Sequence, residues 1–209
     1  MSDFPITLLR SHRNFIADNY DRKLFQELAN QQNPKTMIIS CSDSRVAPET
    51  IFNAKPGELF VVRNVANIIP PYEPDGKHHA TSAAIEFAVQ GLNINHIVVM
   101  GHANCGGIKS ILDPIKKPLS PGDFIGKWMD VIRPIAQGIA EDSIYKKQTI
   151  LEQLSIRNSI NNLRKFPWIN TLEKQKILYI HGAWFDISSG ELWILDPKRD
   201  KFIASHDNL

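Results

Sequence analysis

Short uninterrupted apolar runs alternate along this chain with longer amphipathic stretches. Uninterrupted runs are typical of strands buried on both faces, whereas apolar residues at three- and four-residue intervals are typical of helices. The runs predict strands at residues 36–40, 59–62, 96–100, 177–186 and 192–195. The stripes predict helices at residues 10–31, 78–91, 123–140 and 144–163, with a short one from Gly106 to about Asp113-Pro114. This alternation predicts an α/β fold, a mainly parallel sheet flanked by helices.

The two ends of the chain add detail to this fold. Ser188-Ser189-Gly190 is a turn, so the last predicted strand returns as an antiparallel strand at the C-terminal edge. Asn33-Pro34 ends the first helix, and Pro167 is expected to break the helical pattern. We therefore expect one domain over residues 1–209. Residues 1–34 would form an N-terminal helical segment, whose apolar stripe could pack on the same subunit or on a partner, and residues 35–209 the core with the C-terminal helices and hairpin.

Composition excludes several classes of protein. The 209 residues are 43% hydrophobic and 22% charged, which is typical of a globular protein with a substantial core. A net charge of +2 does not favour a nucleic-acid or membrane partner. No signal peptide or membrane-spanning run is evident from Met1-Ser2 onward, so we expect a cytoplasmic protein. In that compartment cysteines are more often metal-binding, catalytic or buried than disulfide-bonded.

Both cysteines of the chain follow a predicted buried strand. Cys41 comes directly after the first strand, and Cys105 comes in a glycine-bounded loop after the third strand, three residues beyond His102. Thiolate and imidazole are good zinc ligands, and three protein ligands with an open fourth position are typical of a catalytic site. Spacing alone supports equally well two small, buried, inert cysteines.

Two charged residues follow Cys41 closely. Asp43 and Arg45 are two apart, which allows a bidentate ion pair, and the arginine would keep the carboxylate ionised beside a metal. Without the neighbouring cysteine, an ordinary loop salt bridge would be the preferred interpretation.

Several motifs in order resemble the β-class carbonic anhydrases, over roughly residues 20–195. The C-terminal hairpin from His181 to Gly190 is similar as well. The motifs are Cys41-Ser42-Asp43-Ser44-Arg45-Val46, Phe60-Val61-Val62-Arg63-Asn64-Val65-Ala66-Asn67, Ala84-Ile85-Glu86-Phe87-Ala88-Val89 and Gly101-His102-Ala103-Asn104-Cys105-Gly106-Gly107. This resemblance implies a zinc lyase, a carbonate dehydratase, that interconverts carbon dioxide and bicarbonate by attack of zinc-bound hydroxide. It also implies one Zn²⁺ per chain and an N-terminal arm that embraces a partner in a homodimer or homotetramer.

The resemblance assigns roles to residues at the metal. Cys41, His102 and Cys105 match the zinc ligands, and Asp43 with Arg45 matches the catalytic dyad.

It also assigns a substrate pocket at the subunit interface. Gln32 matches a glutamine that binds substrate oxygen in the plant-like subtype, and Gly106 matches a backbone N–H donor. Phe60, Val65 and Phe87 match the apolar wall.

Three positions depart from related subtypes. Phe87 stands where plant-like enzymes usually have tyrosine, and Gly91 stands where some have a histidine proposed to shuttle protons. Buffer, or His78 or His79, is therefore expected to take the proton. Ile38 stands where some bacterial members have a tryptophan that helps form a non-catalytic bicarbonate site, so no inactivation by bicarbonate is expected.

Three rival functions are compatible with parts of the pattern. The same scaffold and ligands occur in hydrolases of carbon disulfide or carbonyl sulfide. A structural zinc protein would need a closed fourth ligand, such as Asp43, and would leave Arg45 and Gln32 without a role. A thiol redox protein is the weakest alternative, because the cysteines do not form a Cys-X-X-Cys motif.

Overall fold

The computed structural model describes residues 3–113, 115, 117–140 and 143–208. By its internal contacts the chain divides into two units, Met1–Asn33 and Pro34–Leu209, which are described separately.

The first unit contains two helices rather than one. Helix α1 (Ile6–Asn14) continues as a π-helical turn, Phe15–Asn19, and α2 (Arg22–Leu28) follows. The prediction of a single helix over residues 10–31 was wrong, because Tyr20 is extended and the Asp21 carboxylate caps α2 by accepting from the Leu24 N–H at 3.0 Å. The rings of Tyr20 and Phe25 stack across this turn, with centroids 4.8 Å apart.

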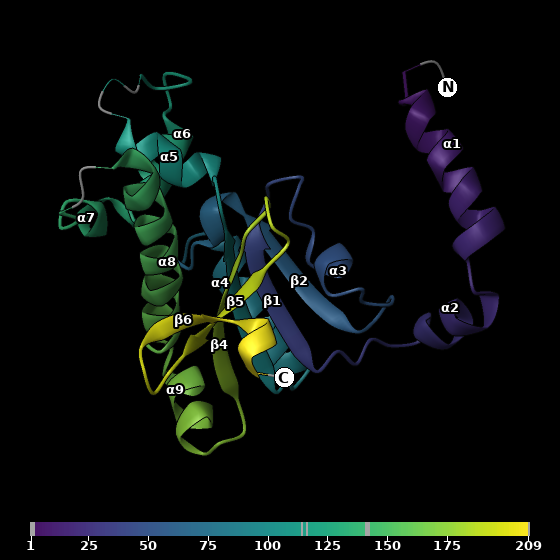
Figure 1. The fold of residues 1–209 in the computed structure, drawn as a ribbon. Helices are drawn as coiled ribbons and strands as arrows, with labels where there is room; N and C mark the ends of the chain where they lie inside the picture. Colours follow the sequence, from purple (N-terminus) through teal and green to yellow (C-terminus); the bar gives the residue numbers. More distant parts are fainter. Residues whose placement is uncertain (1–2, 114, 116, 141–142, 209) are drawn as a thin grey trace. The chain divides into compact units, whose positions relative to one another are not determined.

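The second unit is built on a six-stranded sheet with the order β2-β1-β3-β4-β5-β6 (Figure 1). The first four strands in this order pair in parallel, β5 pairs antiparallel with β4, and β6 pairs antiparallel with β5. This confirms the predicted mainly parallel sheet. The edge strand on the C-terminal side is β6, which was not predicted. The predicted returning strand, β5, therefore lies between β4 and β6 and not at the edge. The strands are β1 (Thr36–Cys41), β2 (Leu59–Asn64), β3 (His96–His102), β4 (Tyr179–Phe185), β5 (Leu192–Asp196) and β6 (Lys201–Ala204).

The helices differ from the prediction mainly at prolines. Residues 123–140 form two short helices because Pro134 lacks the N–H that a continuous helix needs. Pro167 does not break a helix but begins one, a position where its missing N–H is harmless. Pro114, the expected end of a short helix, lies outside the described residues. The helices of this unit are α3 (Pro48–Ile51), α4 (Ala80–Glu86), α5 (Gly106–Leu112), α6 (Phe124–Met129), α7 (Arg133–Ala136), α8 (Ile144–Leu163) and α9 (Pro167–Lys174).

One further predicted helix differs in the structure, and two short turns were not predicted. The helix predicted over residues 78–91 is α4 followed by a π-helical turn, η3 (Phe87–Gly91). A 3-10 turn, η2 (Val65–Asn67), follows β2, and another, η4 (Ser205–Asn208), follows β6. No helix among the described residues is long and apolar enough to cross a membrane.

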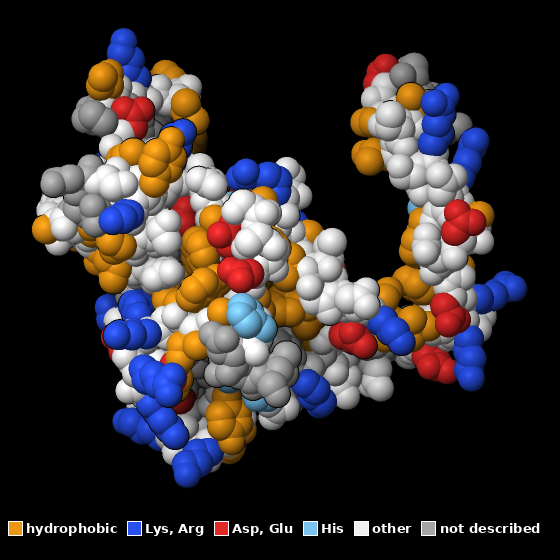
Figure 2. All heavy atoms as spheres, in the orientation of Figure 1, with side chains coloured by type: hydrophobic (Ala, Val, Ile, Leu, Met, Phe, Trp, Pro, Cys, Tyr) orange, Lys and Arg blue, Asp and Glu red, His pale blue; other side chains and the backbone are white. Residues whose placement is uncertain are grey.

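The main core lies between one face of the sheet and helices α4, α8 and α9. Strand β1 shows the division between faces, since Met37 and Ile39 belong to this core while Ile38 belongs to a small cluster on the opposite face. Figure 2 shows apolar side chains at the surface of both units. Because β1 and β3 are parallel neighbours, their last residues, Cys41 and His102, lie at the same edge of the sheet.

Candidate metal centre

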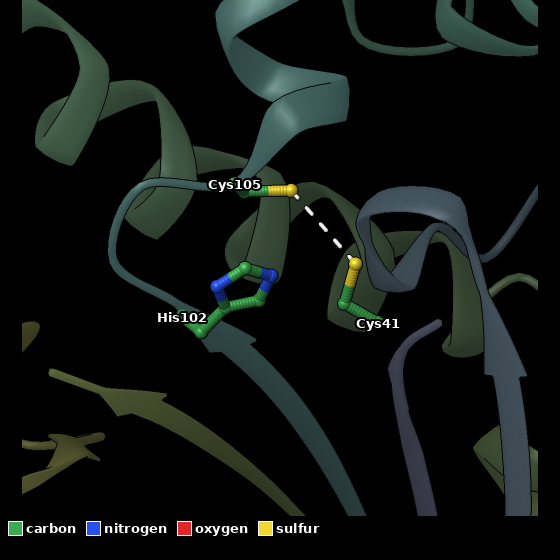
Figure 3. Close-up of side chains that lie close together, drawn as sticks. All are labelled: Cys41, His102 and Cys105. Atoms are coloured by element: carbon green, nitrogen blue, oxygen red, sulfur yellow. Dashed lines mark hydrogen bonds between the residues drawn. The ribbon is translucent and has the colours of Figure 1, made fainter. Parts of the chain in front are cut away.

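Three side chains meet at the carboxyl ends of β1 and β3. Cys41 ends β1, His102 ends β3, and Cys105 immediately precedes α5. All three are buried, and one ligand atom from each lies within 4.8 Å of the other two. Figure 3 shows the two sulfur atoms and the imidazole facing a common point.

The spacing of the two sulfur atoms suits a metal and not a disulfide. Cys41 Sγ and Cys105 Sγ are 3.9 Å apart, about twice the length of an S–S bond. Two thiolates at Zn–S distances of about 2.3 Å in a tetrahedral arrangement lie about 3.8 Å apart.

His102 presents a free nitrogen to the same point. Its Nδ1 donates to the Ala103 carbonyl at 2.8 Å, so Nε2 carries the lone pair. Nε2 is buried and has no hydrogen-bond partner in the described structure. A buried acceptor without a partner is unfavourable, and a metal ion would satisfy it. The residues present therefore fit a zinc ion.

The protons of this group are coupled. The hydrogen bond from Cys105 lowers the pKa of Cys41, and the same contact together with burial raises the pKa of Cys105. Burial opposes protonation of His102, but its interactions with Cys41 outweigh burial and raise the imidazole pKa. Without metal, one thiol stays protonated. A metal cation would displace these protons, so metal affinity should rise with pH.

The predicted Asp43–Arg45 pair forms beside the thiolates. Arg45 Nε and Nη2 donate to the two carboxylate oxygens of Asp43 at 2.9 and 2.6 Å. These hydrogen bonds hold the pKa of Asp43 well below its usual range. Asp43 Oδ2 also lies 3.9 Å from His102 Nε2. The carboxylate is thus ionised and next to the metal position, while both its oxygens are occupied by Arg45.

Two further groups hold the backbone around Cys41. Arg63 donates to the carbonyl oxygens of Cys41 at 3.0 Å and Asp43 at 2.6 Å. The Ala66 N–H donates to Cys41 Sγ at 3.4 Å, from a residue in the left-handed region with φ of 62°. Sequence reasoning included Arg63 in a motif but gave it no role, and it missed the Ala66 amide.

Sequence reasoning also missed a buried carboxylate behind Cys105. Glu152 of α8 accepts from the Cys105 N–H at 3.0 Å, from Trp184 Nε1 at 3.1 Å and from Gln148 Nε2 at 3.1 Å. Burial raises the pKa of Glu152, although these hydrogen bonds oppose the shift. A signal was present in the sequence, because polar residues recur at helical intervals on the buried face of α8.

The predicted substrate-binding residues divide into two groups. Gly106 directly follows Cys105, and Val65 directly precedes Ala66, so both adjoin the metal centre. Phe60 instead pairs with Met37, four residues before Cys41 and so roughly 13 Å along the strand.

The remaining predicted residues are also exposed or remote. Phe87 packs near Phe60, with ring centroids 6.0 Å apart, and it is 51% exposed. Gln32 is exposed and belongs to the first unit. Within one chain, neither aromatic ring joins the metal-ligand group.

Comparisons with known proteins agree with this geometry. A model of the carbonic anhydrase family matches residues 36–192. Beta carbonic anhydrase 3 of Arabidopsis thaliana is 36% identical over 195 residues, which cover 88% of this chain and 75% of that protein. The structure of the β-carbonic anhydrase CcaA superposes with a TM-score of 0.88 at 29% identity, covering 95% of this chain and 90% of that one. A structure from a study of two tetrameric β-carbonic anhydrases of Sordaria macrospora superposes with a TM-score of 0.75 at 28% identity. The match covers 91% of this chain and 94% of that one.

The fold and its cysteine–histidine–cysteine group define a zinc lyase, and this chain belongs to the β-class carbonic anhydrase family. Its activity is the reversible hydration of carbon dioxide to bicarbonate and a proton, with zinc as the cofactor.

Proposed function

We propose that Cys41, His102 and Cys105 hold one zinc ion per chain, and that Asp43 and Arg45 are the catalytic residues of the carbon dioxide hydration. The observation that carries this assignment is the convergence of the three buried ligand atoms beside an ionised carboxylate that is already paired with arginine. A structural zinc would need Asp43 as a fourth ligand, and the bidentate contact with Arg45 opposes this.

Each residue has a defined task in this proposal. Zinc held by Cys41, His102 and Cys105 would supply Lewis acidity that activates water as the nucleophile. Asp43, kept ionised by Arg45, accepts a hydrogen bond from that nucleophile and orients it. The Gly106 N–H donates to the oxygen on which negative charge develops.

The substrate pocket is proposed to form between subunits of a homo-oligomer. Phe60, Phe87 and Gln32 would line the pocket of a partner chain together with that chain's Val65. The exposure of Phe87 and Val65, at 51% and 36%, supports a covering partner. The tetrameric relatives support a dimer or tetramer. Light scattering would test this, since a monomer with full activity would exclude a shared pocket.

We further propose that residues 1–209 act as a single catalytic domain, with residues 1–34 as an arm for assembly. In the described first unit, Phe4, Ile6 and Leu8 are each more than half exposed, which supports an apolar contact with a partner. A cytoplasmic location is proposed because the thiol ligands remain reduced there. Cell fractionation would test the location, and deletion of residues 1–33 followed by light scattering would test the arm.

The proton is proposed to leave through buffer or His78. His78 and His79 both line a cavity of about 550 Å³ that Val65 also lines, but the His79 ring is already paired with Asp75 at 2.7 Å. Gly91 has no side chain to carry a proton, and a Cβ there would lie 3.3 Å from the Phe87 ring. His78→Ala should lower the hydration rate a few-fold at low buffer concentration, and added imidazole buffer should restore it. Rates independent of both buffer and His78 would exclude this route.

Bicarbonate is not expected to inactivate the enzyme. Ile38 is buried in a small apolar cluster, and Asp43 remains paired with Arg45. Bicarbonate should therefore inhibit only weakly and without cooperativity near neutral pH. Strongly sigmoidal inhibition would contradict a standing Asp43–Arg45 pair.

The whole proposal is tested by stopped-flow carbon dioxide hydration from about pH 6.5 to 9, on protein whose zinc has been counted. One zinc per chain and a rate that rises with pH are expected, because two thiolates make the metal a weaker Lewis acid than three imidazoles. One zinc per chain without hydration would exclude the assigned catalytic roles. Assays with carbon disulfide and carbonyl sulfide would then follow.

A further inference from the structure

Helix α8 carries a row of buried polar side chains along its face toward the sheet. They recur at alternating four- and three-residue steps, which is the spacing of one helical face. These residues are Gln148, Glu152, Ser155, Ser159 and Asn162. The helix packs against β3 and β4, and Figure 1 shows it running past α5 at its upper end. Polar groups in such a place need partners, and most of these find them in the loops around the metal centre.

The upper part of this row holds the loop that carries Cys105. Glu152 Oε1 accepts from the Cys105 N–H at 3.0 Å and from Gln148 Nε2 at 3.1 Å, while Oε2 accepts from Trp184 Nε1 at 3.1 Å. Gln148 Nε2 also approaches the Cys105 carbonyl oxygen at 3.5 Å. Both backbone polar groups of Cys105 therefore face α8 side chains.

The lower part of the row holds the loop on the other side of the site. Ser159 donates to the Asn67 carbonyl at 3.2 Å and accepts from the Ile69 N–H at 3.1 Å. Asn162 donates to the Ile69 carbonyl at 2.9 Å. This loop begins with Ala66, whose N–H donates to Cys41 Sγ. One helix thus anchors the surroundings of both thiolates.

We propose that Glu152 is a positioning residue for the metal centre, because its carboxylate fixes Cys105 in the orientation that binds zinc. This inference rests on the proposed role of Cys105 as a ligand. A carboxylate suits the task because both of its oxygens accept, so it can receive three N–H donors at once. An amide of the same shape would turn an N–H₂ group toward one of those donors.

Fixing Cys105 before metal arrives should raise zinc affinity, since less of the loop must be ordered on binding. It should also fix the Gly106 amide, which is the next residue in the chain. Hydrogen-bond partners of metal ligands typically contribute about 10- to 100-fold in metal affinity or activity.

The test is Glu152→Gln, with Ser155→Ala as the matched control. Ser155 lies one step along the same buried row, and its hydroxyl has no hydrogen-bond partner in the described structure. Zinc affinity is measured by competition with a chromogenic chelator. We expect E152Q to bind zinc about 10- to 100-fold more weakly than the unsubstituted protein, and S155A to remain within about twofold. An E152Q affinity within about twofold of S155A would overturn the proposal.

A second substitution separates positioning from simple damage to the core. Trp184→Phe removes the donor that faces Glu152 Oε2, so in E152Q the amide N–H₂ could occupy that side without opposing an N–H. E152Q/W184F should therefore bind zinc more tightly than the product of the two single losses predicts. In the cobalt-substituted protein, E152Q should shift the thiolate-to-cobalt absorption band and the double variant should restore it. If the two substitutions weaken zinc binding independently and the absorption band does not shift, the proposal is overturned.

Two controls keep the result interpretable. If E152Q fails to fold without metal, as judged by circular dichroism, Gln148→Met replaces it. That variant removes one donor from the network and is expected to weaken zinc binding about threefold or more, whereas unchanged affinity would overturn the proposal. Cys105→Ser tests the metal centre itself. Zinc bound as tightly by C105S as by the unsubstituted protein would refute the ligand assignment, independently of Glu152.

Discussion

The two cysteines of the metal centre have contrasting surroundings. Cys41 lies on a charged and accessible side, beside Asp43 and Arg45, and the Arg45 side chain is 50% exposed. Cys105 lies on a buried side. Its backbone N–H donates to Glu152 of α8, which in turn accepts from the buried ring of Trp184. The same kind of ligand is thus supported by an exposed ion pair on one side and by a buried network on the other.

This difference separates two requirements of a catalytic metal site. The accessible side can exchange water, substrate and product, and its charges remain partly hydrated. On the buried side an unpaired polar group is costly, so each hydrogen bond there restricts geometry more strongly. We therefore expect substitutions on the Cys41 side to affect turnover first, and those on the Cys105 side to affect metal retention first.

The largest effect is expected when a ligand is removed from either side. Cys105→Ser or His102→Ala should weaken zinc binding by more than about 100-fold, beyond the range expected for partners of ligands, and should abolish hydration with it. Zinc content after dialysis, measured together with the hydration rate, checks this. A variant that loses zinc but retains hydration would show that the activity lies elsewhere.

The next largest effect should separate the two sides. Arg45→Ala should reduce hydration about 100-fold or more because Asp43 loses the partner that orients it, while zinc stays near one per chain. Arg45→Lys is the matched control, since it keeps the charge but not the bidentate contact, and it should restore only part of the rate. Full hydration by R45A would remove the dyad from the mechanism.

A third substitution tests the contact between α5, which follows Cys105, and the turn at Val65 and Ala66, which contacts Cys41. A Cβ on Gly107 of α5 would lie 2.8 Å from Val65 Cγ1 and 3.2 Å from Ala66 Cβ, whereas a Cβ on Gly106 would meet nothing within 4 Å. Gly107→Ala should lower the free energy of unfolding by about 1–3 kcal/mol through overpacking, and Gly106→Ala should not. Urea unfolding of the metal-free proteins would measure both. Equal stabilities would mean that the loop moves aside freely.

The smallest effect concerns acid stability on the accessible side. The pKa of Asp43 is lower in the folded state than its unfolded value of about 3.9. The pair's contribution to stability is therefore present above that pH, and it is lost as pH falls toward the folded pKa. The stability difference between unsubstituted and R45A metal-free protein should be at most about 1 kcal/mol at neutral pH and should shrink below about pH 4. A difference that grows with acid would contradict this.

The convergence of the three proposed ligands could be predicted from the sequence because it follows from topology. Parallel neighbouring strands bring Cys41 and His102 to one edge, and local spacing then brings Cys105. The role of Glu152 could not be predicted this way, because it depends on which face of α8 meets the sheet. A row of polar residues at helical intervals is equally typical of a solvent-facing surface, and the hydrogen-bond partners of this row lie far away in the sequence.

Other misses have different physical causes. Strand β6 has only four residues, Lys201–Ala204, so its apolar run is too short to predict a strand. The break at Tyr20 depends on capping by Asp21, which an apolar stripe does not show. The distance of Phe60 from the metal centre within one chain follows from strand register, and Phe87 of the π-helical turn η3 packs near Phe60. Whether a second chain brings such rings to the site is a property of an assembly and not of one sequence.

The long sequence separation of the groups around the zinc site has a consequence for how the protein is made. Cys41 leaves the ribosome early, but it cannot join His102 and Cys105 until β1 and β3 have paired in register. Glu152 and Trp184 are synthesised later still. Tight metal uptake would therefore mark the completion of folding, and nascent chains that end before α8 should release zinc readily.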